Sequence, residues 1–368
     1  MKDKKIGIIT FQNAHNYGAM LQVYALQEVL SKYDTKIINY KNPGIEKTYK
    51  PFRINKKNII TIMRSLAAST LYYKRNIKRY KKFNEFINTK LNLTRVYKSE
   101  KELKENPPDF DIYITGSDQV WNYEIACKKI DAYTLNFGSD KTKRISYAAS
   151  IGADELEPKH KEEYIKNINR LDYISVREES ANKYLSKLLN RKIETTLDPT
   201  LLLSQGDWKK FCENAEPEKE KYILSYVLTD DPEYYRIVNY LSQKTGLKVI
   251  HFQRRDNGIK NILRNANTDG PIEFVNLIKN AEYVIATSFH ATIFSIIFNK
   301  KFWIIPPKKR GARITNLLEM LNINDRAVSS LEELIERGYD KEINYKDVEE
   351  ILEREKNKSV DFLNKSIN

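Results

Sequence analysis

Cysteine is scarce in this sequence, with only Cys127 and Cys212 among 368 residues. Two cysteines so far apart are too few for a disulfide framework, and they lack the close spacing of a metal-binding knuckle. No cluster of Asp, His and Glu has metal-ligand spacing either, so we expect no required metal. A reducing cytoplasm is the simplest setting for such a chain.

Long apolar runs are also missing. No stretch has eighteen uninterrupted apolar residues, so we expect no transmembrane helix. The charged first residues are followed by only a short apolar run, which is typical of a first strand rather than of a signal peptide. There is no GxGxxG fingerprint, so dinucleotide binding is not supported.

The sequence does contain enough apolar and aromatic residues for a folded globular protein, since 41% are hydrophobic and there are three Trp, 14 Phe and 24 Tyr. Its length suffices for two domains with separate cores. Alternating strand and helix patterns predict the α/β class. We place an N-terminal domain at residues 1–195, a C-terminal domain at 196–340 and a charged helical tail at 341–368.

The excess positive charge is concentrated in one segment. Lys plus Arg is 63 against 49 Asp plus Glu, a net charge of +14. Residues 46–104 alone contain 17 basic and four acidic residues, a net charge of +13. Residues 58–86 have helical apolar spacing, so this segment is predicted to be a basic helical insert in the N-terminal domain.

One interpretation of the insert is that it contacts an anionic membrane surface at the cytoplasmic face. The alternative is a solvated helical face in a Lys-rich proteome. The basic residues that crowd one short segment are Lys74, Arg75, Lys78, Arg79, Lys81 and Lys82. No nucleic-acid motif accompanies the charge, so we expect no nucleic-acid partner.

The N-terminal strand leads into a polar loop. Residues 5–11 are predicted to form a strand, residues 12–20 a Gly-containing loop and residues 21–30 a helix. This order opens a doubly wound α/β domain, in which ligands bind beyond the carboxyl ends of the strands. His15 and Asn16 lie in the loop and are candidate substrate-binding residues. The alternative is a solvated loop whose asparagines cap the helix.

A second strand-helix junction carries a histidine. Residues 283–286 are predicted to be a buried strand, and Thr287 and Ser288 are good N-cap residues for an apolar helix. His290 then falls in the first helical turn, where free backbone N–H groups and the helix dipole favour an anion. A histidine there can donate a proton near neutral pH. The alternative is a half-buried histidine that only caps the junction.

Arg177 follows a predicted strand at residues 173–176. An arginine at the carboxyl end of a strand can form a bidentate contact with phosphate or carboxylate, but an ion pair with Glu178 or another acid is the commoner arrangement. Asp118 follows a predicted strand and a Gly-Ser turn. It is either a general base or a helix cap.

Several short motifs occur in an order that resembles the polysaccharide pyruvyl transferase family, in particular its capsule and exopolysaccharide branch. They are Asn-Tyr-Gly-Ala-Met-Leu-Gln at 16–22, Gly-Ser-Asp-Gln-Val-Trp-Asn at 116–122, Ser-Tyr-Ala-Ala-Ser at 146–150, Val-Arg-Glu at 176–178, Leu-Asp-Pro-Thr at 197–200, Ser-Phe-His at 288–290, and Arg313. The similarity spans roughly residues 5–320 and leaves out the basic insert and the tail.

The resemblance implies two Rossmann-like domains facing across a cleft, as in GT-B glycosyltransferases, with the acceptor on the N-terminal side and the donor on the C-terminal side. It implies phosphoenolpyruvate as co-substrate, with no other cofactor, and a glycan diol as acceptor, which can be lipid-linked. The product is a cyclic pyruvate ketal.

The family histidine carries over to His290, and two family arginines carry over to Arg177 and Arg313. We add Ser117 and Gln119, on either side of Asp118, as candidate substrate-binding residues. Ser288, Lys309 and Arg313 are further candidate substrate-binding residues. Other branches have an arginine where this chain has Ser288, and Arg313 or Lys309 could hold the donor phosphate in its place.

Two other functions fit parts of the same pattern. One is a GT-B glycosyltransferase that uses a nucleotide sugar, which would release a nucleotide rather than phosphate. The other is a non-catalytic protein whose basic insert binds a polyanion in a salt-sensitive way.

Overall fold

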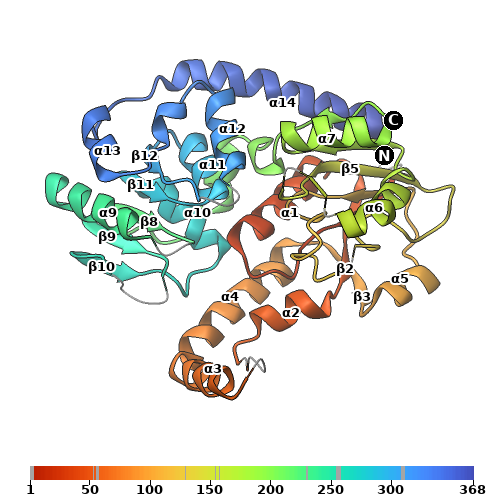
Figure 1. The fold of residues 1–368 in the computed structure, drawn as a ribbon, viewed down its shortest axis with the longest axis horizontal. Coiled ribbons are helices and arrows are strands. Elements are labelled where there is room, and N and C mark those ends of the chain that lie inside the picture. The colour runs from red at the N-terminus through yellow and green to blue at the C-terminus, as the bar shows by residue number, and fades with distance from the viewer. Residues whose placement is uncertain are drawn as a thin grey trace. The chain divides into compact units, whose positions relative to one another are not determined.

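The computed structural model describes residues 4–52, 54, 58–128, 130–153, 155–156, 158–228, 231–253, 258–307 and 311–368 (Figure 1). It divides into two compact units. Unit 1 comprises Met1–Leu202 with Glu355–Asn368, and unit 2 comprises Leu203–Arg354. The sequence places the boundary at residue 195 and separates the tail at 341. The structure extends the first unit to Leu202 and assigns the end of the tail to it.

Unit 1 is built on a seven-stranded parallel sheet with the order β3-β2-β1-β4-β5-β6-β7. The strands are β1 (Lys5–Ile9), β2 (Asp34–Tyr40), β3 (Leu93–Tyr97), β4 (Ile112–Thr115), β5 (Lys143–Ala149), β6 (Tyr173–Val176) and β7 (Glu194–Thr195). The helices are α1 (Tyr17–Val29), α2 (Pro43–Tyr49), α3 (Ile59–Leu71), α4 (Tyr73–Lys90), α5 (Glu100–Glu105), α6 (Lys161–Ile168) and α7 (Glu179–Leu189).

The strand order of unit 1 reverses between β1 and β4. In a doubly wound sheet, ligands bind at such a switch point, beyond the carboxyl ends of the strands. β4 is buried along its whole length, and β1 is buried after its first residue, as expected for central strands that are covered on both faces. The motifs at 116–122, 146–150 and 176–178 reach or follow the carboxyl ends of β4, β5 and β6.

Unit 2 has a five-stranded parallel sheet with the order β10-β9-β8-β11-β12. The strands are β8 (Tyr222–Tyr226), β9 (Lys248–His251), β10 (Ile262–Asn265), β11 (Tyr283–Ala286) and β12 (Lys301–Ile304). The helices are α8 (Gln205–Phe211), α9 (Pro232–Thr245), α10 (Pro271–Asn280), α11 (Phe289–Ile297), α12 (Ala312–Met320), α13 (Leu331–Arg337) and the first part of α14 (Tyr345–Ile367). Here the order reverses between β8 and β11, next to the predicted histidine. Two doubly wound parallel sheets confirm the predicted α/β class with two Rossmann-like domains.

The basic insert differs from its prediction in two ways. Instead of one helical stretch, residues 58–86 contain α3 and most of α4, separated by Tyr72, which ends one helix and begins the other. The segment 46–104 also contains β3, which pairs with β2 at the edge of the sheet. The insert is therefore partly an integral piece of unit 1. Among the described residues, no helix is both long and apolar enough to cross a membrane.

Helix α14 contributes to both units. Near its start, the Tyr345 hydroxyl donates to the carbonyl oxygen of Lys300 in unit 2 at 2.5 Å. Further along, Ser359 Oγ accepts from the Leu197 N–H at 2.9 Å, and the Ile367 carbonyl accepts from Lys4 Nζ at 2.7 Å, both within unit 1.

Candidate functional site

The loop after β4 has a backbone that depends on its glycine. Gly116 has a φ of +117°, and a Cβ at this position would lie 2.1 Å from the carbonyl oxygen of Tyr147. Asp118 also has a positive φ, 71°, which Asp tolerates better than most residues. The Asp118 carbonyl accepts from the Ser150 N–H at 3.0 Å, and the Trp121 N–H donates to the Ser150 carbonyl at 3.1 Å. The loop is thereby held against the end of β5.

Ser117 joins three of the motifs. Its N–H donates to Gln22 Oε1 at 3.0 Å, and its hydroxyl lies 3.0 Å from the Ala148 carbonyl oxygen and 3.2 Å from Asp198 Oδ2. Ser117 is fully buried, so these protein groups occupy its polar atoms. It was predicted to bind substrate; the structure gives it contacts that hold the loop.

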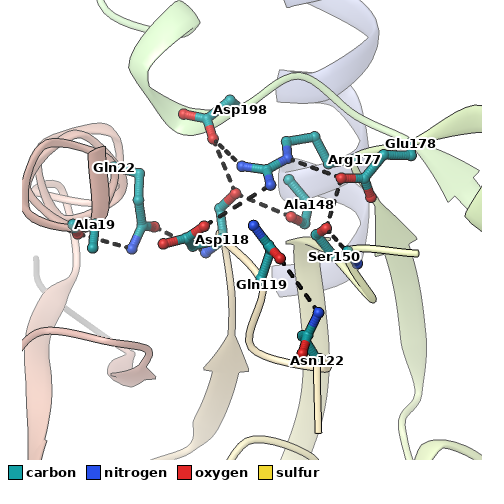
Figure 2. Close-up of polar contacts among 12 residues, drawn as sticks. Ala19, Gln22, Asp118, Gln119, Asn122, Ala148, Ser150, Arg177, Glu178 and Asp198 are labelled. Carbon is teal, nitrogen blue, oxygen red and sulfur yellow. Dashed lines mark hydrogen bonds and ion pairs between the residues drawn. The ribbon is translucent and has the colours of Figure 1, made fainter. Parts of the chain in front are cut away.

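Arg177 lies at the centre of this cluster and faces three carboxylates (Figure 2). Its guanidinium nitrogens are 2.9 Å from Asp198, 3.4 Å from Glu178 and 4.0 Å from Asp118. Burial lowers the pKa of Arg177, but the charges of Glu178, Asp198 and Asp118 outweigh that effect and leave the pKa raised. The ion pair with Glu178, the alternative considered from the sequence, is therefore present.

The three carboxylates differ in their surroundings. Glu178 accepts from the Ser150 hydroxyl at 2.6 Å, and Asp198 accepts from the Thr200 N–H at 3.1 Å and hydroxyl at 2.7 Å. The exposed side-chain fractions are 0% for Asp198, 8% for Glu178 and 17% for Asp118. Asp118 is thus the carboxylate of this group that is best placed to meet a substrate.

Gln119 lies on the same loop as Asp118 and is buried. Its Oε1 accepts from Asn122 Nδ2 at 3.4 Å, and a Cβ on Gly152 would lie 2.3 Å from that oxygen. The side chain therefore packs closely against the backbone that follows β5.

His15 is enclosed by aromatic rings from the insert. Its ring centroid lies 5.6 Å from Tyr49, 4.9 Å from Tyr80 and 5.1 Å from Phe83. Burial, followed by the positive charges of Arg79 and Lys41, lowers the pKa of His15 to about 4. These surroundings suit a neutral packed ring. The substrate-binding role of His15 stays a prediction.

Asn16 caps α1, because its side chain accepts from the Ala19 N–H at 3.2 Å. This is the alternative considered from the sequence. The cap occupies the side-chain oxygen of Asn16.

In unit 2 the predicted local structure around the histidine is confirmed. β11 covers Tyr283–Ala286, and Ser288 is the N-cap of α11, with its side chain accepting from the Ala291 N–H at 3.5 Å. Thr287 Oγ1 accepts from the Leu228 N–H at 2.9 Å, which joins the ends of β11 and β8. His290 is in the first turn of α11 and is largely buried.

One aromatic ring links His290 and Arg313. The Phe289 ring centroid is 5.4 Å from that of His290, nearly perpendicular to it, and 5.5 Å from Arg313 Cζ. A guanidinium over an aromatic face is held by a cation–π attraction. Arg313 is the second residue of α12. Lys309, the other candidate for the donor phosphate, lies outside the described residues.

The predicted residues thus form separate groups. Unit 1 brings together Asp118, Ser117 and Arg177, and places His15 under the insert. Unit 2 brings together His290, Ser288 and Arg313. Sequence reasoning missed Gln22 and Asp198 as members of the site, although both lie in the family motifs, and it considered Glu178 only as an ion-pair partner of Arg177. A signal for Gln22 was its position as a polar residue in an apolar stretch of helix, where it is fully buried.

Among the residues that the structure describes, no group of three or more His, Cys, Asp or Glu is arranged to hold a metal ion. The cation in the cluster of unit 1 is Arg177 itself.

Comparisons with known proteins agree with the motifs. No curated protein matches this sequence. Solved structures with a related fold include UDP-GlcNAc 2-epimerase from Methanocaldococcus jannaschii (13% identity, TM-score 0.47, covering 95% of this chain and 99% of that one). They also include the glycosyltransferase SsfS6 of Streptomyces sp. SF2575 (12% identity, TM-score 0.46, covering 96% of this chain and 96% of that one). A third is the heptosyltransferase WaaC of E. coli (11% identity, TM-score 0.40, covering 95% of this chain and 99% of that one). Such low identities concern the fold alone. A family model described as polysaccharide pyruvyl transferase matches residues 16–309, and the chain belongs to this family.

Proposed function

We propose that this protein transfers the enolpyruvyl group of phosphoenolpyruvate onto two hydroxyls of a glycan, forming a cyclic pyruvate ketal in cell-surface polysaccharide biosynthesis. The observation that carries the proposal is the convergence of the family motifs. Gln22, Ser117, Ser150, Arg177 and Asp198 are scattered along unit 1, yet their side chains form one polar cluster near the ends of its central strands. Packing alone does not require so many polar groups at one place.

For the donor we propose His290 and Arg313. Phosphoenolpyruvate carries a phosphate and a carboxylate, and a guanidinium and a helix N-terminus both bind such groups. Arg313 and His290 both contact the Phe289 ring, which brings the two candidate donor groups close together. The Ser288 side chain caps α11 and carries no positive charge. We therefore assign the binding of the donor phosphate to Arg313 or to Lys309.

For the acceptor we propose Asp118 as general base. It is the most exposed carboxylate of the cluster, and the loop that carries it is fixed by Gly116 and Ser150. Arg177 would then hold Asp118 in place, since its own contacts are to carboxylates. That Arg177 binds a donor anion stays a prediction. A donor anion would have to compete with these ion pairs for the guanidinium.

The proposed reaction is balanced as follows. His290 donates a proton to the methylene carbon of phosphoenolpyruvate, which becomes a methyl group and leaves an oxocarbenium-like carbon. The first glycan hydroxyl adds to that carbon and gives its proton to Asp118. Phosphate leaves with the electrons of its C–O bond. The second hydroxyl then adds to the same carbon and gives its proton to the now neutral His290, so the products are the ketal and inorganic phosphate.

The experiment compares donors. The purified protein is incubated with a pool of glycan acceptors and either phosphoenolpyruvate or sugar nucleotides. Phosphate release that depends on acceptor, together with an acceptor mass gain of one pyruvate minus one water, is the expected result. Release of nucleotide from a sugar nucleotide, with no use of phosphoenolpyruvate, would show a glycosyltransferase instead. Surface glycan from cells that lack this gene supplies the acceptor pool. The masses of surface glycans from cells with and without the gene should differ by the same pyruvate ketal.

A further inference from the structure

Helix α3 turns its apolar side to solvent. Only Ser69 of this helix is buried, and Ile62 and Ser65 are half-buried. The exposed apolar residues, with their exposed fractions, are Ile59 (75%), Ile60 (63%), Met63 (66%), Leu66 (44%) and Leu71 (74%). With 3.6 residues per turn they fall within an arc of roughly 140°. A helix that packs on its own protein normally has the reverse arrangement, with the apolar side inward.

This apolar face is a patch and not a set of isolated residues. Single exposed apolar side chains are ordinary on any protein surface, but contiguous ones mark a binding surface. Phe52 and Ile54, which precede the helix, are also exposed. Figure 1 shows α3 beyond the end of α4, away from the sheet of unit 1. We call the five side chains of α3 the apolar face.

The segment that carries the apolar face is basic and contains no acidic residue. Residues 47–84 contain 12 Lys or Arg and no Asp or Glu. On α4 the exposed residues Lys74, Lys78 and Lys81 recur at spacings of four and three, so they form one stripe along the helix. Arg64 is an exposed basic residue on α3 itself.

Arg79, one of the six basic residues singled out in the sequence, does not belong to this surface. Its guanidinium donates to the Tyr17 hydroxyl at 2.5 Å and to the His15 carbonyl at 3.2 Å. It also lies over the Phe83 ring, with Cζ 4.5 Å from the centroid. Arg79 therefore fastens the insert to unit 1, and the exposed lysines remain for an external partner.

We propose that α3 is an interfacial membrane anchor, which lies in the surface of an anionic bilayer with its apolar face among the acyl chains. The lysine stripe of α4 contacts the lipid headgroups. Charge complementarity selects this occupant, because a segment with no acidic residue is attracted to an anionic surface. The apolar face distinguishes a bilayer from a soluble polyanion, since a polysaccharide or nucleic acid offers it nothing to be buried in. This inference does not depend on pyruvyl transfer.

The test is sedimentation of the full chain with vesicles of phosphatidylcholine alone or of phosphatidylcholine mixed with phosphatidylglycerol. Two triple variants separate the apolar contribution from the charge contribution. The apolar variant combines Ile59→Ser, Ile60→Ser and Met63→Ser. The lysine variant combines Lys74→Gln, Lys78→Gln and Lys81→Gln. All six positions are exposed, so circular dichroism should show unchanged folding. We expect binding to the anionic vesicles only. Each triple variant should lower the partition coefficient at least about tenfold, because both burial of apolar groups and attraction of each lysine contribute.

Matched controls change similar surface elsewhere. Leu228→Ser with Ile335→Ser removes two apolar side chains that are 57% and 49% exposed, and Lys183→Gln with Lys187→Gln and Lys210→Gln removes three exposed lysines. Both controls should bind like the unchanged protein. The proposal is overturned if the protein stays in the supernatant with anionic vesicles at low salt. Unchanged binding by the apolar variant would show attraction by charge alone. Self-association that this variant abolishes would identify the apolar face as a contact between copies of the chain.

Discussion

At the scale of single residues, His290 is the side chain on which the proposed chemistry depends most. We expect His290→Gln to lower turnover by about 10²–10⁴-fold, because no other group would deliver the proton to the methylene carbon. Ser295→Ala, about one and a half turns along α11, is a control, since Ser295 is also buried and its hydroxyl donates to the Ala291 carbonyl within the helix at 2.8 Å. Turnover is measured as phosphate release. A His290→Gln protein as active as the control would remove His290 from the reaction.

Arg177 and Asp118 can be separated by a double-mutant cycle. If Arg177 positions Asp118, then Arg177→Lys should lower kcat by about tenfold or more, because an ammonium cannot span three carboxylates as a guanidinium does. In an Asp118→Asn background, Arg177→Lys should lower kcat by a much smaller factor, since the two residues act together. The KM for phosphoenolpyruvate should stay nearly constant in both. A raised KM with unchanged kcat would instead assign Arg177 to donor binding.

Changes at Arg313 are expected to affect the KM for phosphoenolpyruvate, in contrast to changes at Arg177, which are expected to affect kcat. Arg313→Ala should raise the KM for phosphoenolpyruvate, because a charge-assisted contact to a donor anion is lost. Phe289→Leu should raise the KM less, since it removes the cation–π contact of Arg313 but leaves the guanidinium in the protein. Substrate titration by initial rates measures both. If neither change alters KM, the donor anion is held elsewhere.

At the scale of elements, the packing of the insert on unit 1 should respond to pH. The pKa of His15 is about 4 in the folded protein, below its ordinary value of 6.5. The neutral ring is therefore favoured by folding, so stability is complete above pH 6.5 and is lost as the pH falls toward 4. Between pH 7 and pH 5 the free energy of unfolding should drop by about 2 kcal/mol more in the wild type than in His15→Phe. Urea unfolding at the two pH values gives this difference. Equal drops in both proteins would mean that His15 titrates normally.

Elements with a strong local pattern could be predicted from the sequence, and elements at the edges could not. β6 and β11 were predicted with their observed bounds, because each is a clear apolar run between turn or cap residues. The edge strand β10 is half-buried throughout, and only one residue of the edge strand β3 is buried. An edge strand has fewer apolar positions, so both were missed.

The candidate site was predictable only in part for a similar reason. His290 and Arg177 were found because a strand end precedes each of them. The contacts of Ser117 with Gln22 and Asp198 join residues that are 95 and 81 positions apart. No local pattern encodes such pairs, although the motifs that contain them were recognised.

At the scale of the whole molecule, α14 should support the two units independently. Leu363 and Val348 are both 2% exposed, but Leu363 lies in the part of α14 that belongs to unit 1 and Val348 in the part that belongs to unit 2. Leu363→Ala should cost about 2–5 kcal/mol through the cavity it leaves. Hydrogen exchange should accelerate in residues 4–202 for Leu363→Ala and in residues 231–353 for Val348→Ala. Acceleration across both ranges in either variant would show that the units unfold as one.

The shared helix also sets an order of events on the ribosome. Unit 2 is one continuous segment, whereas unit 1 needs residues 355–368, which are synthesised after all of unit 2. At about 5–20 residues per second, the nascent sheet of unit 1 waits on the order of ten seconds or more for the helix segment that carries Ser359 and Ile367. Domains usually complete their folding in the order of their synthesis. In this protein the second unit can be complete first, while the Leu197 N–H and Lys4 Nζ of unit 1 wait for the Ser359 and Ile367 oxygens that accept from them.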